Sequence, residues 1–196
     1  EENKKMGSIE IWIHLAFNIS LRDANLNHAN LENAELSGMD LCNADLRYAN
    51  LKGANLYSAN LQYADLRCAN LTNARLVNAY LNHVELDYAC FLVADMDNAC
   101  LSNIKANKVD FTRANLRYTN LSESILCASN FYDANLKDAN LRNCNLLNAN
   151  FNFANLLNAD LSQSDLRKCN FNDSILRNTN LKFCDLKRIS LDNADL

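Results

Sequence analysis

Residues 54–71 read ANLYSANLQYADLRCANL, and the chain from residue 21 onward repeats the same five-residue pattern. A large aliphatic or aromatic residue stands at every fifth position from Leu21 to Leu196, and Ala106 is the one weak member. A small residue, most often Ala, stands two positions earlier. Because no helix has a period of five, we expect the large and small residues to share one core, with the other positions, mostly polar, in water.

A short internal period of this kind indicates a solenoid, in which each turn of the chain contacts only its neighbours. The sequence also indicates how many units close one turn, because the phenylalanines at the large position recur every twenty residues, as Phe91, Phe111, Phe131, Phe151 and Phe171. Four units would then form one coil, and the chain would contain about nine coils of twenty residues.

Two further features of the repeat carry structural predictions. Asn before the large residue recurs at the same spacing and predicts ladders of stacked amides, at Asn30, Asn50 and Asn70 and again at Asn130, Asn150 and Asn170. Between Ile104 and Val109 the usual sizes are inverted, since Ile104 precedes the small Ala106. We expect a distorted coil there.

The repeating triplet is Ala-Asn-Leu at 24–26, 134–136 and 154–156 and Ala-Asp-Leu at 44–46 and 64–66. This pattern, A(D/N)LXX, resembles that of the pentapeptide repeat family over about nine tenths of the chain. The resemblance implies an all-β fold, a right-handed quadrilateral parallel β-helix with the large and small residues inside. Residues 21–196 would form this β-helix.

The two ends of the chain lead to separate expectations. Apolar and polar residues alternate over 9–19, which predicts that residues 1–20 form an N-terminal cap on the first coil; a secretory hydrophobic region is the alternative. The stretch is too short and too polar for a transmembrane helix, so no membrane association is expected. The pattern reaches Leu196 without a cap. The chain could therefore be a fragment, or its last coil could join a second copy in a homodimer.

The cysteines and histidines give little sign of chemistry. Three of the eight cysteines occupy the small inward position, and no C-x-x-C motif is present, so we expect reduced thiols and a cytoplasmic location. A disulfide between Cys68 and Cys90 is the alternative. The histidines, His14, His28 and His83, do not converge. Without a phosphate loop or a nucleophile elbow, the sequence predicts no enzyme and no cofactor or metal.

The charge pattern bears on one function that the resemblance suggests. Some members of the family resemble duplex DNA and bind gyrase or topoisomerase IV in its place, so a DNA-mimicking regulator is one hypothesis. Here the net charge is only −4, and the acidic column Asp45, Asp65, Glu85, Asp165 and Asp185 is followed two residues later by Arg47, Arg67, Arg167 and Lys187. These charges cancel, which favours exposed ion pairs over a polyanion and gives no basis for direct nucleic-acid binding.

Outward apolar residues provide the remaining functional signal. They occur at Leu92, Val93, Tyr132, Leu147, Phe153 and Leu157, and Tyr57 and Val77 form a smaller pair. A loose apolar cluster on an otherwise polar rod is typical of a contact surface for another protein. The sequence therefore favours a non-enzymatic interaction or scaffold module, with topoisomerase regulation as the alternative.

Overall fold

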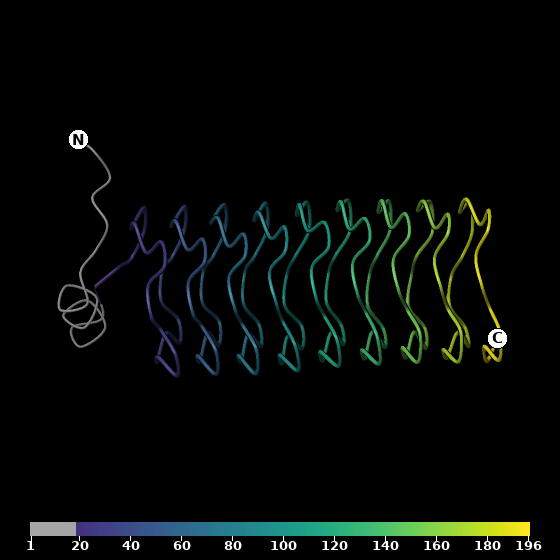
Figure 1. The fold of residues 1–196 in the computed structure, drawn as a ribbon, viewed down its shortest axis with the longest axis horizontal. Coiled ribbons are helices and arrows are strands. Elements are labelled where there is room, and N and C mark those ends of the chain that lie inside the picture. Colours follow the sequence, from purple (N-terminus) through teal and green to yellow (C-terminus); the bar gives the residue numbers. More distant parts are fainter. Residues whose placement is uncertain (1–18) are drawn as a thin grey trace.

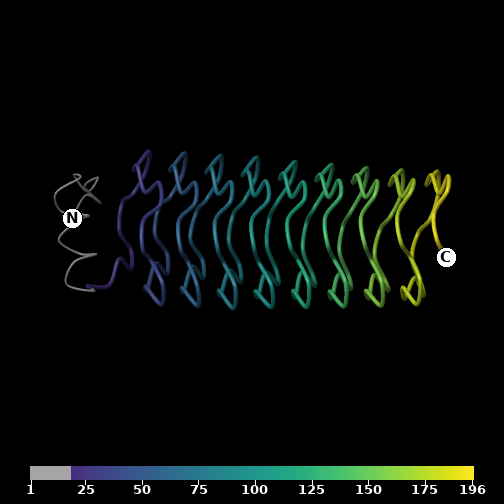
Figure 2. The same cartoon turned by 90° about the horizontal axis from the view of Figure 1, so that it is seen from below.

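The computed structural model describes residues 19–196, which form a rod of coils stacked along one axis (Figure 1). The chain advances steadily from one end of this rod to the other, and the view turned by 90° shows the same regular stacking (Figure 2). Most of the predicted cap, residues 1–20, lies outside the described residues. The repeating part alone therefore positions every surface considered below.

The β structure consists of isolated parallel bridges, each joining one residue to the residue twenty positions later. The bridges begin with Asn25 and Asp45 and end with Ile175 and Asp195, always at the position before the large residue. Over residues 19–196 there is no helix and no longer strand. This register confirms the predicted coil of twenty residues, whereas the right-handed sense and the number of coils stay predictions.

Each five-residue unit begins with a tight turn that forms one corner of the coil. In the unit that begins at Leu61, the Ala64 N–H donates to the Leu61 carbonyl at 3.0 Å. The third residue of the turn, Tyr63, has φ of 61°. A positive φ at this position is the property of type II turns, and Asn, Asp and Gly tolerate it best. Side chains at the two central turn positions project from the corner.

Backbone hydrogen bonding explains why Asn or Asp precedes the large residue. Three N–H groups of the unit donate to adjacent coils, as in Leu61 to Tyr80 (2.8 Å), Tyr63 to Asn82 (3.1 Å) and Asp65 to Ala44 (3.0 Å). A fourth N–H, that of Ala64, makes the hydrogen bond that closes the turn. The fifth, that of Gln62, donates to Oδ1 of Asn60 at 3.2 Å. The amide or carboxylate thus completes the backbone pairing, which a buried coil requires.

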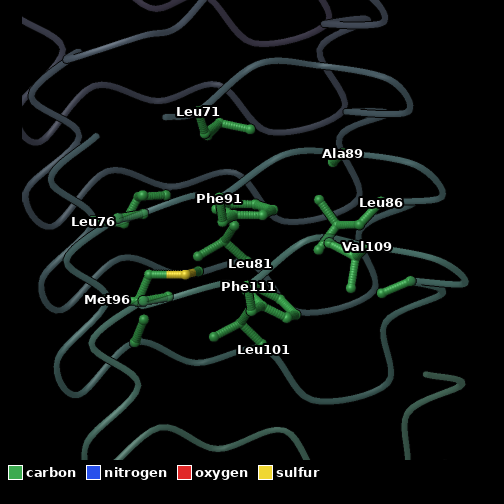
Figure 3. Packing of buried hydrophobic residues seen from close by; sticks show 14 of the residues in the cluster. Leu71, Leu76, Leu81, Leu86, Ala89, Phe91, Met96, Leu101, Val109 and Phe111 are labelled. Carbon is green, nitrogen blue, oxygen red and sulfur yellow. The ribbon is translucent and has the colours of Figure 1, made fainter. Parts of the chain in front are cut away.

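The core is a set of vertical columns of large and small side chains. The large residues from Leu21 to Phe171 are buried, and the close-up shows Phe91 lying over Phe111 among leucines (Figure 3). The five phenylalanines form a continuous stack, with centroids 5.1, 5.2, 4.7 and 4.9 Å apart in chain order. These spacings match the inter-coil distance of about 4.8 Å, so each coil adds one ring to the column.

Some of the predicted amide ladders form and others do not. The Asn50 amide donates to Asn30 Oδ1 at 3.1 Å, and the Asn150 amide donates to Asn130 Oδ1 at 2.9 Å. Within the described part of the chain, Asn70 and Asn170 make no such bond to the asparagine one coil earlier. The ladders are therefore pairs rather than the continuous columns predicted.

The predicted distortion near Ile104 is confined to the turns. The turn-closing hydrogen bond is missing at Ile104 and Val109, but it is also missing at Val84, Ser124 and Cys144, so its loss is not specific to the inverted sizes. The Ile104 N–H donates instead to Oγ of Ser124 at 3.2 Å. Bonds between coils persist, as in Lys105 N–H to the Val84 carbonyl at 3.1 Å. The stack therefore absorbs the size inversion without losing its register.

Candidate interaction surface

The six apolar residues predicted as a partner patch all lie at central turn positions, and the structure places them at three corners. Leu92, Val93, Tyr132 and Phe153 share the corner that follows Leu31 and its equivalents every twenty residues, called the Leu31 corner. Leu147 lies at the corner that follows Leu26 and its equivalents, called the Leu26 corner. Leu157 lies at the corner that follows Leu36 and its equivalents, called the Leu36 corner. The predicted patch is therefore not one continuous surface.

Tyr132 and Phe153 form the best-defined part of the patch. Their ring centroids are 5.3 Å apart and their planes meet at 62°, an edge-to-face contact between neighbouring coils. Phe153 is 48% exposed. Leu92 and Val93 lie two coils earlier, and the ion pair from Arg113 Nε to Asp133 Oδ2, at 3.1 Å, intervenes. The ion pair therefore separates Tyr132 and Phe153 from Leu92 and Val93.

Two residues of the patch also occupy backbone conformations that suit them poorly. Val93 has φ of 58° and Phe153 has φ of 61°. Bulky and β-branched residues rarely adopt this left-handed region, where Asn is common. Neither side chain is placed there by a folding requirement, since most equivalent turns of this chain carry small or polar residues.

Leu147 belongs to a different surface from the aromatic pair. It lines a groove of about 310 Å³ together with Arg167, Lys168, Lys187 and Arg188. Arg167 Nη2 pairs with Asp165 at 2.6 Å, and Lys187 Nζ pairs with Asp185 at 3.4 Å. The surroundings of Leu147 are therefore basic and only partly neutralised, unlike the apolar cluster predicted from the sequence.

The acidic column that directly precedes the Leu26 corner, which begins with Asp45 and Asp65, is neutralised by a ladder of ion pairs. Arg47 contacts Asp45 at 2.7 Å and Asp65 in the next coil at 3.6 Å, and Arg67 contacts Asp65 at 2.5 Å and Glu85 at 3.5 Å. The hydrogen bond from Arg47 lowers the pKa of Asp45 and outweighs the opposing effect of its partial burial. These pairs agree with the predicted solvated ladder, and they leave no continuous acidic strip on this side.

A comparison with protein-family profiles shows to which family the chain belongs. The family profile described as pentapeptide repeats matches in eight copies, over residues 24–62, 64–103, 94–133, 110–146 and 134–173. The chain belongs to the pentapeptide repeat family. The predicted family membership is therefore confirmed.

Solved pentapeptide repeat proteins share this fold along most of their length. HetL from the cyanobacterium Nostoc sp. strain PCC 7120, a protein involved in heterocyst differentiation regulation, is 29% identical with a TM-score of 0.50. The similarity covers 97% of this chain and 95% of HetL. QnrB1, a plasmid-mediated fluoroquinolone resistance protein, is 19% identical with a TM-score of 0.53, covering 84% of this chain and 87% of QnrB1. No curated protein sequence matches the chain.

Within the part of this pentapeptide repeat chain that the structure describes, the remaining candidate residues do not converge on one site. The eight cysteines are free thiols, so Cys68 and Cys90 are not joined in a disulfide. His28 and His83 lie at different corners and coils. Among residues 19–196, no group of three His, Cys, Asp or Glu side chains could hold a metal ion. The same residues contain no helix long and apolar enough to cross a membrane.

Stacked rings at the corners are the surface feature that the sequence reasoning missed. His28 stacks on Tyr48 with centroids 4.8 Å apart and planes at 6°, and Tyr63 stacks on His83 at 4.9 Å and 5°. In each pair the two residues are twenty positions apart at the same turn position. The spacing already used for the core phenylalanines would have found both pairs. Aromatic columns of the pentapeptide repeat therefore occur outside the core as well as inside it.

Proposed function

We propose that this protein is a non-enzymatic protein-interaction module, a rigid right-handed rod of about nine coils that works in the cytoplasm. The observation that carries the proposal is the edge-to-face contact of the half-buried Tyr132 with the exposed Phe153. Aromatic side chains are enriched at the centres of protein interfaces, because each supplies a large contact area at a low entropic cost. Leu157 lies at the next corner of the coil that holds Phe153, so a partner that spans both corners would contact it as well.

Affinity capture with paired variants tests the proposal. Immobilised wild-type protein and the double variant Phe153→Asn, Leu157→Asn are exposed to an extract of the source cells, and captured proteins are identified by mass spectrometry. We expect the double variant to lose a specific partner while its melting curve is unchanged or improved. Tyr118→Asn is the matched control. Tyr118 is 47% exposed and, like Phe153, is the third residue of its turn, but it lies at the Leu36 corner. Equal capture by all three proteins would refute the proposed surface.

A second copy of the chain is a further proposed partner. The final coil leaves Leu186, Leu191 and Leu196 exposed, whereas the large residues of inner coils are buried. Pairing of two such coils would cover these leucines and the unpaired backbone edge. Sedimentation equilibrium should detect a dimer that the variant Leu191→Lys dissociates. A wild-type chain that remains monomeric at high concentration would exclude this assembly.

Charge gives no support to the alternative of a DNA-mimicking topoisomerase regulator. A duplex carries one negative charge per roughly 1.7 Å of axis, whereas the acidic residues of the column that precedes the Leu26 corner are paired with arginines and lysines. We expect micromolar protein to leave DNA supercoiling by purified gyrase unchanged. Inhibition, or protection against a quinolone, would instead revive the regulatory hypothesis.

A further inference from the structure

The outer aromatic column at the Leu26 corner is interrupted after its second ring. In order along the rod, the third turn residues of this corner are His28, Tyr48, Cys68, Tyr88 and Lys108. His28 and Tyr48 are stacked. Cys68 supplies no ring in the next coil, and Tyr88 follows in the coil after that. One position of the column therefore lacks the ring that its neighbours have.

Each of the two tyrosines has its described ring contact with a residue of the coil farther from Cys68. His28 covers one face of Tyr48 at 4.8 Å. Lys108 lies over Tyr88 with Nζ 5.2 Å from the ring centroid, on the side away from Cys68. Tyr48 and Tyr88 are 54% and 58% exposed. Tyr48 and Tyr88 thus line the space beside Cys68 from the coils before and after it.

The size of this space matches one ring. Tyr48 and Tyr88 are two coils apart, which at about 4.8 Å per coil amounts to roughly 9.6 Å. A ring placed midway would lie about 4.8 Å from each neighbour, within the range of stacked aromatic pairs. The stacked pairs of this protein have centroid distances of 4.7 to 5.2 Å in the core and of 4.8 and 4.9 Å at the corners.

The structure contains a groove at this place. It has a volume of about 280 Å³ and is lined by Arg47, Tyr48, Arg67, Cys68, Asp87 and Tyr88. This is below the usual size of a pocket for a drug-sized ligand, which begins at about 300 Å³. The groove therefore suits a single side chain better than a whole cofactor.

The groove offers a guest a free hydrogen-bond acceptor but no free cation. Arg47 and Arg67 are already paired with Asp45, Asp65 and Glu85, so the site offers no free cation for a phosphate. Asp87 Oδ1 accepts hydrogen bonds from the backbone and side-chain nitrogens of Asn107, at 2.7 and 3.0 Å. Its second oxygen has no donor among the described residues. A phenol O–H or an indole N–H would complement that acceptor.

We infer that this groove binds a tyrosine or tryptophan side chain of a partner protein, which completes the interrupted column between Tyr48 and Tyr88. The inference rests on the proposed interaction function and adds a specificity site to it. The bound ring would stack on both tyrosines and place its polar group beside Asp87. Cys68, which is small, leaves the room for it.

Binding of single amino-acid amides tests the chemistry of the site without a partner protein. Amide resonances of Cys68 and Tyr88 are followed by NMR during titration with N-acetyl-tyrosinamide, N-acetyl-leucinamide and adenosine monophosphate, each to tens of millimolar. We expect the tyrosine probe to saturate these resonances and the leucine probe to bind at least roughly tenfold more weakly. No response to the tyrosine probe would overturn the inference. Tighter binding of the nucleotide would replace the protein partner with a nucleic acid.

Substitutions at Cys68 provide the matched variants. Cys68→Tyr supplies the missing ring from the chain itself, at a backbone conformation that Tyr48, Tyr63 and Tyr88 already adopt. It should weaken the tyrosine probe at least roughly tenfold, whereas Cys68→Ala should stay within about twofold of the wild type. Tyr88→Leu, which removes one wall, should also weaken binding. Equal affinity in wild type and Cys68→Tyr would place the probe elsewhere and refute the site.

The outcomes separate the groove from the wider functional proposal. If the probe binds but Phe153→Asn, Leu157→Asn captures the same proteins as the wild type, the groove stands and the Tyr132 and Phe153 surface fails. If capture depends on Phe153 and the probe does not bind, the interaction function stands and the groove inference is wrong.

Discussion

The core column of phenylalanines and the outer column at the Leu26 corner obey the same spacing but differ in completeness. In the core, Phe91 to Phe171 place a ring in every coil, and all five are buried. At the Leu26 corner, His28, Tyr48 and Tyr88 occupy three of four successive coils, and Cys68 interrupts them. A gap in the first column would be an empty cavity, whereas a gap in the second is open to water and to a partner.

The difference shows where the repeat constrains the sequence and where it does not. Inside the rod each missing methylene leaves a void that the neighbouring coils cannot fill, because the hydrogen bonds between coils fix their spacing. At the corners only the turn conformation is imposed, and it tolerates residues from Gly53 to Phe153. Recognition can therefore be encoded at the corners without changing the scaffold.

The largest expected effect comes from opening a gap in the inner column. Phe131→Ala should reduce the free energy of unfolding by about 3–5 kcal/mol, since the ring is lost and a cavity remains. Phe131→Leu, the residue used in this column by Leu71, should cost much less. Urea denaturation of the two variants measures the contrast. A loss below roughly 1 kcal/mol for Phe131→Ala would mean that the coils collapse into the space.

A substitution at Val93 is expected to stabilise the fold, in contrast to Phe131→Ala. Its φ of 58° lies in the left-handed region that β-branched residues avoid. Val93→Asn should raise the free energy of unfolding by roughly 1 kcal/mol. Asn73→Val, the reciprocal change one coil earlier at the same turn position, should lower it by a similar amount. Destabilisation by Val93→Asn would show that the valine contributes packing that outweighs its backbone strain.

The sequence predicted the parts of this structure that depend on the period alone. The inward positions of Leu61 and Ala64, the twenty-residue coil and the stacking of the core phenylalanines all follow from spacing. The pairing of Asp45 with Arg47 was predicted from their separation of two residues. The role of Asn60 as a partner for a backbone N–H was not predicted, because it requires the turn geometry.

The candidate surface was less predictable, because the period does not say which corner residues contact one another. Tyr132 and Phe153 occupy different turn positions, so their contact depends on rotamers rather than register. Leu147 was grouped with apolar residues, although four basic side chains surround it. The groove at Cys68 exists because a small residue stands where the neighbouring coils carry rings. Cys68 is not unusual in the sequence by itself, so the pattern did not single it out.

A smaller effect is expected from breaking the outer column. Tyr48→Leu removes the stacking on His28, which should cost about 0.5–1.5 kcal/mol, several times less than Phe131→Ala. Tyr80→Leu is the control, because Tyr80 is exposed and forms no stacked ring pair within residues 19–196. Thermal denaturation should therefore rank the variants Phe131→Ala, Tyr48→Leu and Tyr80→Leu in decreasing order of damage. A larger loss for Tyr48→Leu than for Phe131→Ala would contradict the distinction between inner and outer columns.

The smallest expected effect is the pH dependence of the ion pairs beside the outer column. Arg47 holds the pKa of Asp45 below its usual value in the folded chain. The carboxylate therefore stabilises the fold fully above the pKa of the unfolded chain, about 3.9, and loses this contribution as the pH falls through the lower folded value. Asp45→Asn should be less stable than the wild type near neutral pH and should approach it near pH 2.

Because Arg47 is exposed to water, the difference at neutral pH should be small and should shrink further in high salt. The core phenylalanines do not titrate, so the deficit of Phe131→Ala relative to the wild type should keep its size across the same pH range. Profiles of stability against pH that run parallel for Asp45→Asn and the wild type would show that the pair of Asp45 and Arg47 contributes nothing to the fold. The corner side chains would then matter mainly for recognition.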